Sequence, residues 1–208
     1  PLNMNATLEK LKDTEIVIFA GGISPLLEGE EMKVSAAGFK GGDRTDIELP
    51  AVQRNVLAAL KKAGKKVIFV NFSGSAMALT PVTENCDAIL QAWYPGQEGG
   101  TAVADVLFGD YNPAGRLPVT FYKNMEQLPD FVDYSMQGRT YRYMKEAPLF
   151  PFGYGLSYTT FTYGKARADK KRFSTGEKMT LTIPVSNIGS RDGEEVVQVY
   201  LRPEDDPE

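Results

Sequence analysis

"KKVIFVNFSG", residues 65–74, is a short apolar run that ends in a Ser-Gly step. Similar runs occupy residues 15–22 ("EIVIFAGG") and residues 87–96 ("DAILQAWYPG"), and both also end in glycine. Short apolar runs bounded by glycine are typical of parallel strands that are buried on both faces. We therefore predict three such strands in the first half of the chain.

Helical patterns separate these predicted strands. Residues 50–63 carry apolar side chains at helical spacing, Pro50 suits the first turn of a helix, and Gly64 suits its C-terminal cap. Residues 78–86 and 98–109 are expected to form two more helices. Alternation of strands and helices implies parallel strands joined by right-handed crossovers. The fold class is therefore predicted as α/β, a layered α/β sandwich with a mostly parallel sheet.

The second half of the chain has a different texture. Residues 110–163 are rich in Pro, Gly and aromatic residues, which indicates an ordered, irregular belt. Residues 177–203 alternate apolar and polar side chains in two runs around "NIGSRDG", the pattern of a β-hairpin and of the first strands of a truncated β-sandwich. The expected domains are residues 1–124, a linker or belt over 125–164, and the start of the β-sandwich over 165–208.

The composition excludes several classes of function. The 208 residues include 23 basic and 27 acidic ones, and a net charge of −4 argues against a nucleic-acid partner. A single cysteine, Cys86, and no histidine exclude a disulfide within the chain, zinc sites built on Cys and His, and a Ser-His-Asp system. No apolar run approaches the ~20 residues that a membrane helix needs. Any acid–base chemistry must therefore use carboxylates.

Carboxylates gather directly after the first predicted strand, in "SPLLEGEE" (24–31). Ligands of parallel α/β sheets bind at the carboxyl ends of the strands, so this segment is expected at the functional edge. In an extended loop Glu28 and Glu30 would point to one side and Glu31 to the other. One of them could be the general acid of a glycosidase, opposite a second carboxylate, or the cluster could simply be solvated. The residues alone leave both interpretations open.

Two other groups near this edge have a structural interpretation beside a functional one. "GGDR" (41–44) could bind an anion, but Asp43 and Arg44 are expected rather to fix the loop through hydrogen bonds and an ion pair, and so to orient the glutamates. Glu98 precedes a predicted helix, where the helix dipole is a sufficient reason for a carboxylate. No dinucleotide or Walker loop is present.

Three separated motifs resemble one known family. They are "GGDRTDIELP" (41–50), "WYPGQEGGTAVADVLFGDYNPAGRLPVTF" (93–121) and "GRTYRYMKEAPLFPFGYGLSYTTFTY" (138–163). They are similar to the C-terminal half of glycoside hydrolase family 3, in particular to its β-xylosidases and β-glucosidases. The last stretch, residues 185–203, resembles the first strands of the fibronectin type III-like domain that follows in many members. The missing initiator Met and the incomplete β-sandwich agree with an excerpt of a longer protein.

The resemblance implies half of an active site. In this family an N-terminal (β/α)8 barrel carries an Asp nucleophile and the following α/β sandwich contributes the general acid/base. Cleavage retains the anomeric configuration, which requires carboxyl groups ~5–5.5 Å apart. The chain alone is therefore expected to be inactive. The resemblance implies no metal and no organic cofactor, and the implied partners are an oligosaccharide and the barrel of the same parent chain.

The resemblance also ranks the glutamates. In many three-domain members the acid/base lies in a mobile loop after the first strand of the sandwich, which points to Glu30 first and Glu28 second. In two-domain members it lies in the motif matching "PGQEGG", which makes Glu98 the alternative. Glu31 ranks last, because alternation along an extended loop would turn it away.

The implied activity is that of a β-xylosidase acting on the non-reducing ends of plant-derived oligosaccharides. A β-glucosidase or an α-L-arabinofuranosidase of the same family comes next, and a non-catalytic carbohydrate-binding or interaction module belongs to a different class. Family members from polysaccharide-degrading bacteria are often exported, so a periplasmic or secreted location is expected. The sequence leaves the sugar, the linkage and the oligomeric state open.

Overall fold

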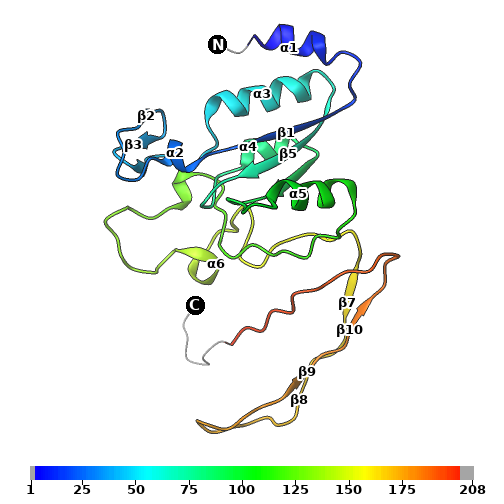
Figure 1. Cartoon of the computed structure of the whole chain (residues 1–208). Coiled ribbons are helices and arrows are strands. Elements are labelled where there is room, and N and C mark those ends of the chain that lie inside the picture. The colour runs from blue at the N-terminus through cyan, green and yellow to red at the C-terminus, as the bar shows by residue number, and fades with distance from the viewer. Residues whose placement is uncertain (1–2, 202–208) are drawn as a thin grey trace. The chain divides into compact units, whose positions relative to one another are not determined.

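The computed structural model describes residues 3–201, and these divide into two compact units (Figure 1). The first unit comprises the described residues up to Val103 together with Leu117–Tyr154. The second comprises Ala104–Arg116 and the described residues from Gly155 onward. The domain limits expected from the sequence, at residues 124 and 164, remain predictions.

A three-stranded parallel sheet forms the centre of the first unit. Its strands are β1 (Ile16–Gly22), β5 (Lys66–Phe72) and β6 (Ala88–Gln91), in the order β1-β5-β6. Val17 lies opposite Val67, and Phe69 lies opposite Ile89. The three predicted strands and their parallel arrangement are therefore confirmed. The expected burial on both faces is wrong for β1, an edge strand of this sheet in which Ile16 and Ile18 are 50% and 46% exposed.

Helices connect these strands as predicted. α3 (Ala51–Lys62) begins directly after Pro50 and ends near Gly64, which has a φ of +75°. α3 packs on β1 and β5, and α1 (Met4–Lys10) packs on α3 (Figure 1). Along the chain, α4 (Thr80–Asn85) connects β5 to β6, and α5 (Gly99–Phe108) follows β6. Glycine suits the end of α3 because, without a Cβ, it adopts the left-handed conformation at little steric cost.

The core lies around the central strand. Val67 and Phe69 of β5 are fully buried, and Leu57 and Leu60 of α3 pack against the same cluster. The ring of Phe19 stacks on that of Phe69 at a centroid distance of 5.9 Å. Burial of each such side chain contributes about 1.5–3 kcal/mol. This core holds the carboxyl ends of the strands in fixed positions.

A helix and a small sheet occupy the segment between β1 and α3. α2 (Pro25–Glu28) is a single turn, and β2 (Ser35–Ala36), β3 (Phe39–Lys40) and β4 (Asp43–Arg44) form an antiparallel sheet. In Figure 1, α2, β2 and β3 lie together at the left of the unit. The interpretation of residues 24–31 as an extended loop is wrong, because Ser24 and Pro25 start a helix there.

The aromatic belt of the first unit is irregular and ordered, as predicted. It contains only η1 (Met125–Gln127), α6 (Thr140–Tyr143) and a β-bridge between Phe121 and Phe150. Phe121 is 1% exposed and contacts Phe150 edge-on. These aromatic residues stabilise the fold.

The second unit contains two short antiparallel pairs. β7 (Phe161–Tyr163) pairs with β10 (Val185–Asn187), and β8 (Arg167–Ala168) pairs with β9 (Leu181–Thr182). The predicted hairpin around "NIGSRDG" is wrong in its pairing, because residues 188–201 form no strand and β10 pairs with β7.

A partly buried ion pair and a tyrosine hydroxyl hold the segment after β10. Glu195 accepts a 2.6 Å hydrogen bond from Arg116 and another of 2.6 Å from the hydroxyl of Tyr163. The side chains of Arg116 and Glu195 are only 11% and 17% exposed. The alternation of apolar and polar residues in this segment indicates an extended backbone, but it does not specify which strand the segment pairs with.

Candidate active site

The carboxyl ends of β1, β5 and β6 meet at one edge of the sheet, where α/β proteins bind their ligands. The segments that follow these strands carry most of the residues singled out in the sequence. They are residues 23–34, 73–79 and 92–98.

The segment after β1 is a compact turn. The hydroxyl of Ser24 caps α2 by accepting a hydrogen bond from the amide of Leu27. Gly29 ends the helix with a φ of +64°, and Glu31 adopts a φ of +56°. The amide of Met32 then donates a 2.8 Å hydrogen bond to the carbonyl of Gly29. The turn 29–32 therefore has a defined backbone, and the alternation argument for its glutamates does not apply.

The glutamates of this turn have different environments. Glu28 is half-buried, and its Oε2 accepts a 2.7 Å hydrogen bond from the hydroxyl of Tyr94. Glu30 and Glu31 are exposed, and within residues 3–201 no hydrogen bond or ion pair engages the carboxylate of Glu30. Among the described residues, the same holds for the carboxylate of Glu31, so Glu30 and Glu31 are both free to meet a ligand, whereas Glu28 is engaged.

Glu98 lies in a different segment, just before α5. Its side chain is exposed and accepts a 3.2 Å hydrogen bond from the hydroxyl of Thr101. A carboxylate that pairs with a first-turn hydroxyl next to the positive end of a helix dipole is explained by local structure. The structure therefore places Glu28 and Glu30 together and gives Glu98 a separate local contact.

Arg44 connects the small antiparallel sheet to the segment after β5. Its guanidinium donates to the hydroxyl of Ser75 at 2.9 Å, to the carbonyl of Ala76 at 3.2 Å and to the carbonyl of Asp46 at 3.2 Å. Burial lowers the pKa of Arg44 from its usual value, while the nearby negative charges of Glu28 and Asp46 act in the opposite direction. Asp43, the neighbour of Arg44, is exposed.

A polar network that sequence reasoning missed lies beneath this edge. Asn71 and Ser73 are fully buried, and the amide of Asn71 donates to the side chain of Gln91 at 2.6 Å. Gln91 in turn donates to the hydroxyl of Ser73 at 3.1 Å. The signal in the sequence was the pair of polar residues that ends the apolar run of β5. The side-chain Oδ1 of Asn71 is buried and accepts no hydrogen bond within the described residues, so the network is only partly satisfied.

Tyr94 is the other residue whose role was missed. Burial raises the pKa of Tyr94 to about 12, and its hydrogen bond to Glu28 adds to the rise. The hydroxyl of Tyr94 therefore remains a protonated donor at neutral and moderately alkaline pH. The sequence showed an aromatic residue after a strand, but nothing in it identified Glu28 as the acceptor.

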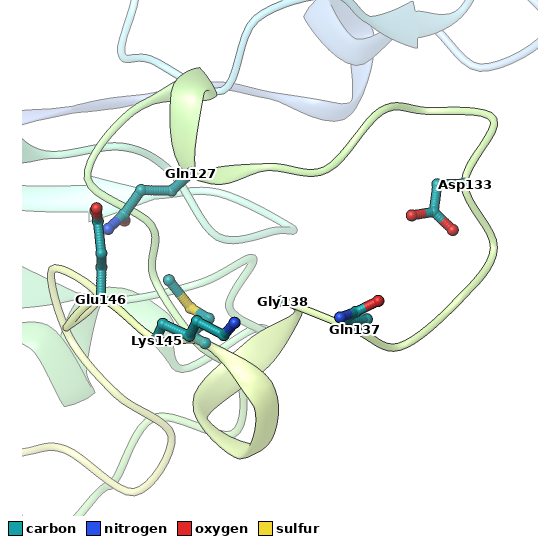
Figure 2. A pocket seen from close by; sticks show the side chains of 7 residues that line it. Gln127, Asp133, Gln137, Gly138, Lys145 and Glu146 are labelled. Carbon is teal, nitrogen blue, oxygen red and sulfur yellow. The ribbon is translucent and has the colours of Figure 1, made fainter. Parts of the chain in front are cut away.

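A separate hollow of about 380 Å³ lies in the irregular belt (Figure 2). Its lining includes Gln127, Asp133, Lys145 and Glu146, and none of the candidate acid/base residues contributes to it. Among the described residues, no group of three or more Asp, Glu, Cys or His side chains is arranged to hold a metal ion. Within residues 3–201, no helix is both long and apolar enough to cross a membrane.

The fold and this site define a parallel α/β domain with carboxylates at its ligand-binding edge. Residues 2–158 match the model of the glycosyl hydrolase family 3 C-terminal domain. The chain therefore belongs to glycoside hydrolase family 3 through this C-terminal domain.

Curated relatives are longer enzymes. A xylan 1,4-β-xylosidase of Xylanibacter ruminicola is 63% identical over 207 residues, which are 100% of this chain and 24% of the relative. A periplasmic β-glucosidase of Salmonella typhimurium is 43% identical over 76% of this chain and 22% of the relative. The chain thus spans about a quarter of the length of the curated relatives it matches.

Solved structures give the same result. A β-glucosidase from Erythrobacter marinus superposes with a TM-score of 0.75 at 36% identity, covering 91% of this chain and 25% of that chain. A β-glucosidase from Listeria innocua in complex with isofagomine gives a TM-score of 0.70 at 27% identity, covering 89% and 26%. The fold predicted from the sequence is the fold of this family's C-terminal domain.

Proposed function

We propose that this chain is the C-terminal part of a retaining, exo-acting β-glycosidase whose substrates are β-xylosides at the non-reducing ends of plant-derived oligosaccharides. The observation that supports this most is the 63% sequence identity between the whole chain and the xylan 1,4-β-xylosidase. In the proposed parent enzyme an N-terminal barrel supplies the Asp nucleophile, and the turn 29–32 of this chain faces the sugar bound there.

Glu30 is the proposed general acid/base. In the first step its carboxylic acid protonates the glycosidic oxygen while the nucleophile forms a covalent glycosyl-enzyme, and the leaving sugar departs as an alcohol. In the second step the carboxylate of Glu30 takes a proton from the attacking water, and the bond to the nucleophile breaks. The exposed, unengaged carboxylate of Glu30 supports this role, because no partner among the described residues of this chain has to be displaced before it meets a sugar.

Glu28 and Glu98 are the alternatives for this role. Tyr94 already engages the carboxylate of Glu28, and Thr101 that of Glu98, so both have local partners from which they would have to separate. Asp43 and Arg44 are proposed to orient the loop, a role that the three hydrogen bonds of Arg44 support. A periplasmic or secreted location is part of the proposal, supported by the Salmonella relative that is named periplasmic.

The test uses the full-length parent enzyme with Glu30→Ala and the matched variants Glu28→Ala and Glu98→Ala. A 2,4-dinitrophenyl β-xyloside needs little acid assistance, so Glu30→Ala should form the glycosyl-enzyme and then stall. Azide should restore turnover and yield β-xylosyl azide, whereas hydrolysis of xylobiose should fall by about 10²–10⁴-fold.

The outcomes separate the assignments. Azide rescue in Glu28→Ala or Glu98→Ala alone would transfer the role to that residue, and no rescue in any of the three variants would refute the assignment to Glu30, Glu28 and Glu98. A parent that prefers aryl β-glucosides or α-L-arabinofuranosides over β-xylosides would correct the sugar and leave the mechanism. A parent without glycosidase activity would favour a carbohydrate-binding module.

A further inference from the structure

We propose that Tyr94 is a positioning residue for the acid/base turn: its hydroxyl holds Glu28 and thereby fixes the backbone from which Glu30 projects. This inference rests on the proposed function. It concerns a residue 66 positions away in sequence from the carboxylate that it holds.

The position of Tyr94 is itself tightly determined. Its ring lies against Gly74, where an added Cβ would come within 2.6 Å of the ring carbon Cε2. The preceding residue, Trp93, adopts a φ of +56°, which non-glycine residues rarely do. The ring of Trp93 contacts the ring of Phe121 edge-on at a centroid distance of 6.0 Å. Strained backbone that the surrounding packing maintains is frequent at functional sites, and here it directs Tyr94 toward the glutamates.

The link from Glu28 to Glu30 is short. Only Gly29 separates them, and its φ of +64° turns the chain directly after the last residue of α2. Holding the carboxylate of Glu28 at 2.7 Å from the hydroxyl of Tyr94 therefore fixes the beginning of the turn that carries Glu30. The side chain of Glu30 itself remains exposed.

The small antiparallel sheet also supports the turn. A Cβ added at Gly42 would come within 3.0 Å of the carbonyl oxygen of Gly29 and 3.1 Å of the amide nitrogen of Glu31. The small sheet that contains Arg44 therefore packs directly on the backbone of the turn, and Arg44 ties this sheet to Ser75. The backbone of Glu30 is thus supported by the packing of Gly42 and, through Glu28, by the hydrogen bond from Tyr94.

The chemistry of the pair suits a positioning role. A phenol that stays protonated can only donate to a carboxylate, and such charge-assisted hydrogen bonds are short and strong. The positive charge of Arg44 lies near Glu28 as well. Loss of the phenolic hydroxyl would leave Glu28 without this donor and would allow the turn to move, while the chemical groups of Glu30 would remain.

The experiment is a leaving-group comparison in the full-length parent with Tyr94→Phe, and with Tyr134→Phe as the matched control, since Tyr134 is 90% exposed. An acid that is displaced by about 1 Å loses up to about 100-fold in rate. We expect kcat/KM for xylobiose to fall by about 10- to 100-fold in Tyr94→Phe, while kcat/KM for the 2,4-dinitrophenyl xyloside changes less than about threefold. Tyr134→Phe should match the wild type with both substrates.

Gly74→Ala provides a second, independent perturbation, because its new methyl group would displace the ring of Tyr94 without removing a polar group. It should reproduce the leaving-group dependence of Tyr94→Phe. An equal loss with both substrates would show a merely structural role, and unchanged xylobiose hydrolysis would show no role; either result overturns the inference.

Glu30→Ala in the same assay separates this inference from the function on which it rests. If Glu30→Ala depends on the leaving group and Tyr94→Phe does not, positioning by Tyr94 is refuted and the acid/base assignment stands. If Glu30→Ala shows no such dependence, the acid/base assignment fails, and positioning of Glu30 by Tyr94 fails with it.

Discussion

Gln53→Met should destabilise the first unit by removing a hydrogen-bonded contact between α3 and the end of β1. The amide group of Gln53 donates to the carbonyl of Gly22 at 2.7 Å, and its Oε1 accepts from the amide of Gly22 at 2.8 Å. Gly22 is buried and its φ is +119°. Methionine keeps the length of the side chain but offers neither the donor nor the acceptor.

The size of the effect follows from the two backbone groups that lose their partner. A buried backbone group left without a hydrogen bond costs about 1–3 kcal/mol, and a partly buried site lies at the lower end of that range. Two such groups give an expected loss of about 2–4 kcal/mol in the free energy of unfolding. With a urea m-value of about 2 kcal/mol/M, the midpoint should fall by about 1–2 M at unchanged m.

The assay is urea unfolding of the 208-residue chain, followed by the fluorescence of its one tryptophan, Trp93. Gln97→Met is the matched control, because Gln97 is exposed in the segment before α5 and should change stability by less than about 0.5 kcal/mol. A Gln53→Met midpoint equal to that of Gln97→Met would refute the argument that this amide stabilises the β1 terminus.

Two further predictions concern titratable groups. The carboxylate of Asp87 accepts hydrogen bonds from the amide of Val67 and from Lys61, and these lower its pKa below the usual 3.8. The contribution of Asp87 to the free energy of unfolding is therefore present above about pH 4 and is lost as the pH falls through the lower pKa of the folded state. Asp87→Asn should therefore be less stable than wild type in urea at pH 7, and the difference should shrink as the pH falls below about 4; a constant difference would contradict this. Burial raises the pKa of the Cys86 thiol to about 11, so little reactive thiolate is present at pH 8. Iodoacetamide labelling at pH 8, followed by mass spectrometry, should therefore be much slower in the folded chain than in urea, and equal rates would contradict this.

Periodicity in short windows predicted the sheet and its helices well. The apolar run of β5 reflects burial on both faces and the helical spacing of α3 burial on one face, whereas β1 alternates exposed and half-buried residues although its sequence is a continuous apolar run. The location of the carboxylates at the carboxyl edge follows from the parallel topology, which the strand–helix alternation implies. The family likewise follows from local motifs, and the match over residues 2–158 agrees with them.

The conformation of residues 24–32 was not predicted, although its signal was present. Ser24 followed by Pro25 is a typical start of a helix, and the single turn of α2 depends on it. The ranking of the glutamates assumed an extended loop instead. The pairing of β10 was missed for a related reason, since alternation describes the faces of a strand and not its neighbour.

The sequence by itself determined the class of fold, the family and the small set of carboxylates from which an acid/base can come, because these depend on residue types and on spacings within one strand or one helix. Only the tertiary structure decided which glutamate is engaged and which is free. The contact of Tyr94 with Glu28 joins the segment after β6 to the segment after β1, and these two strands are separated in the sheet by β5. Such a contact depends on strand order and on the packing of a ring against Gly74, which no local pattern in the sequence encodes.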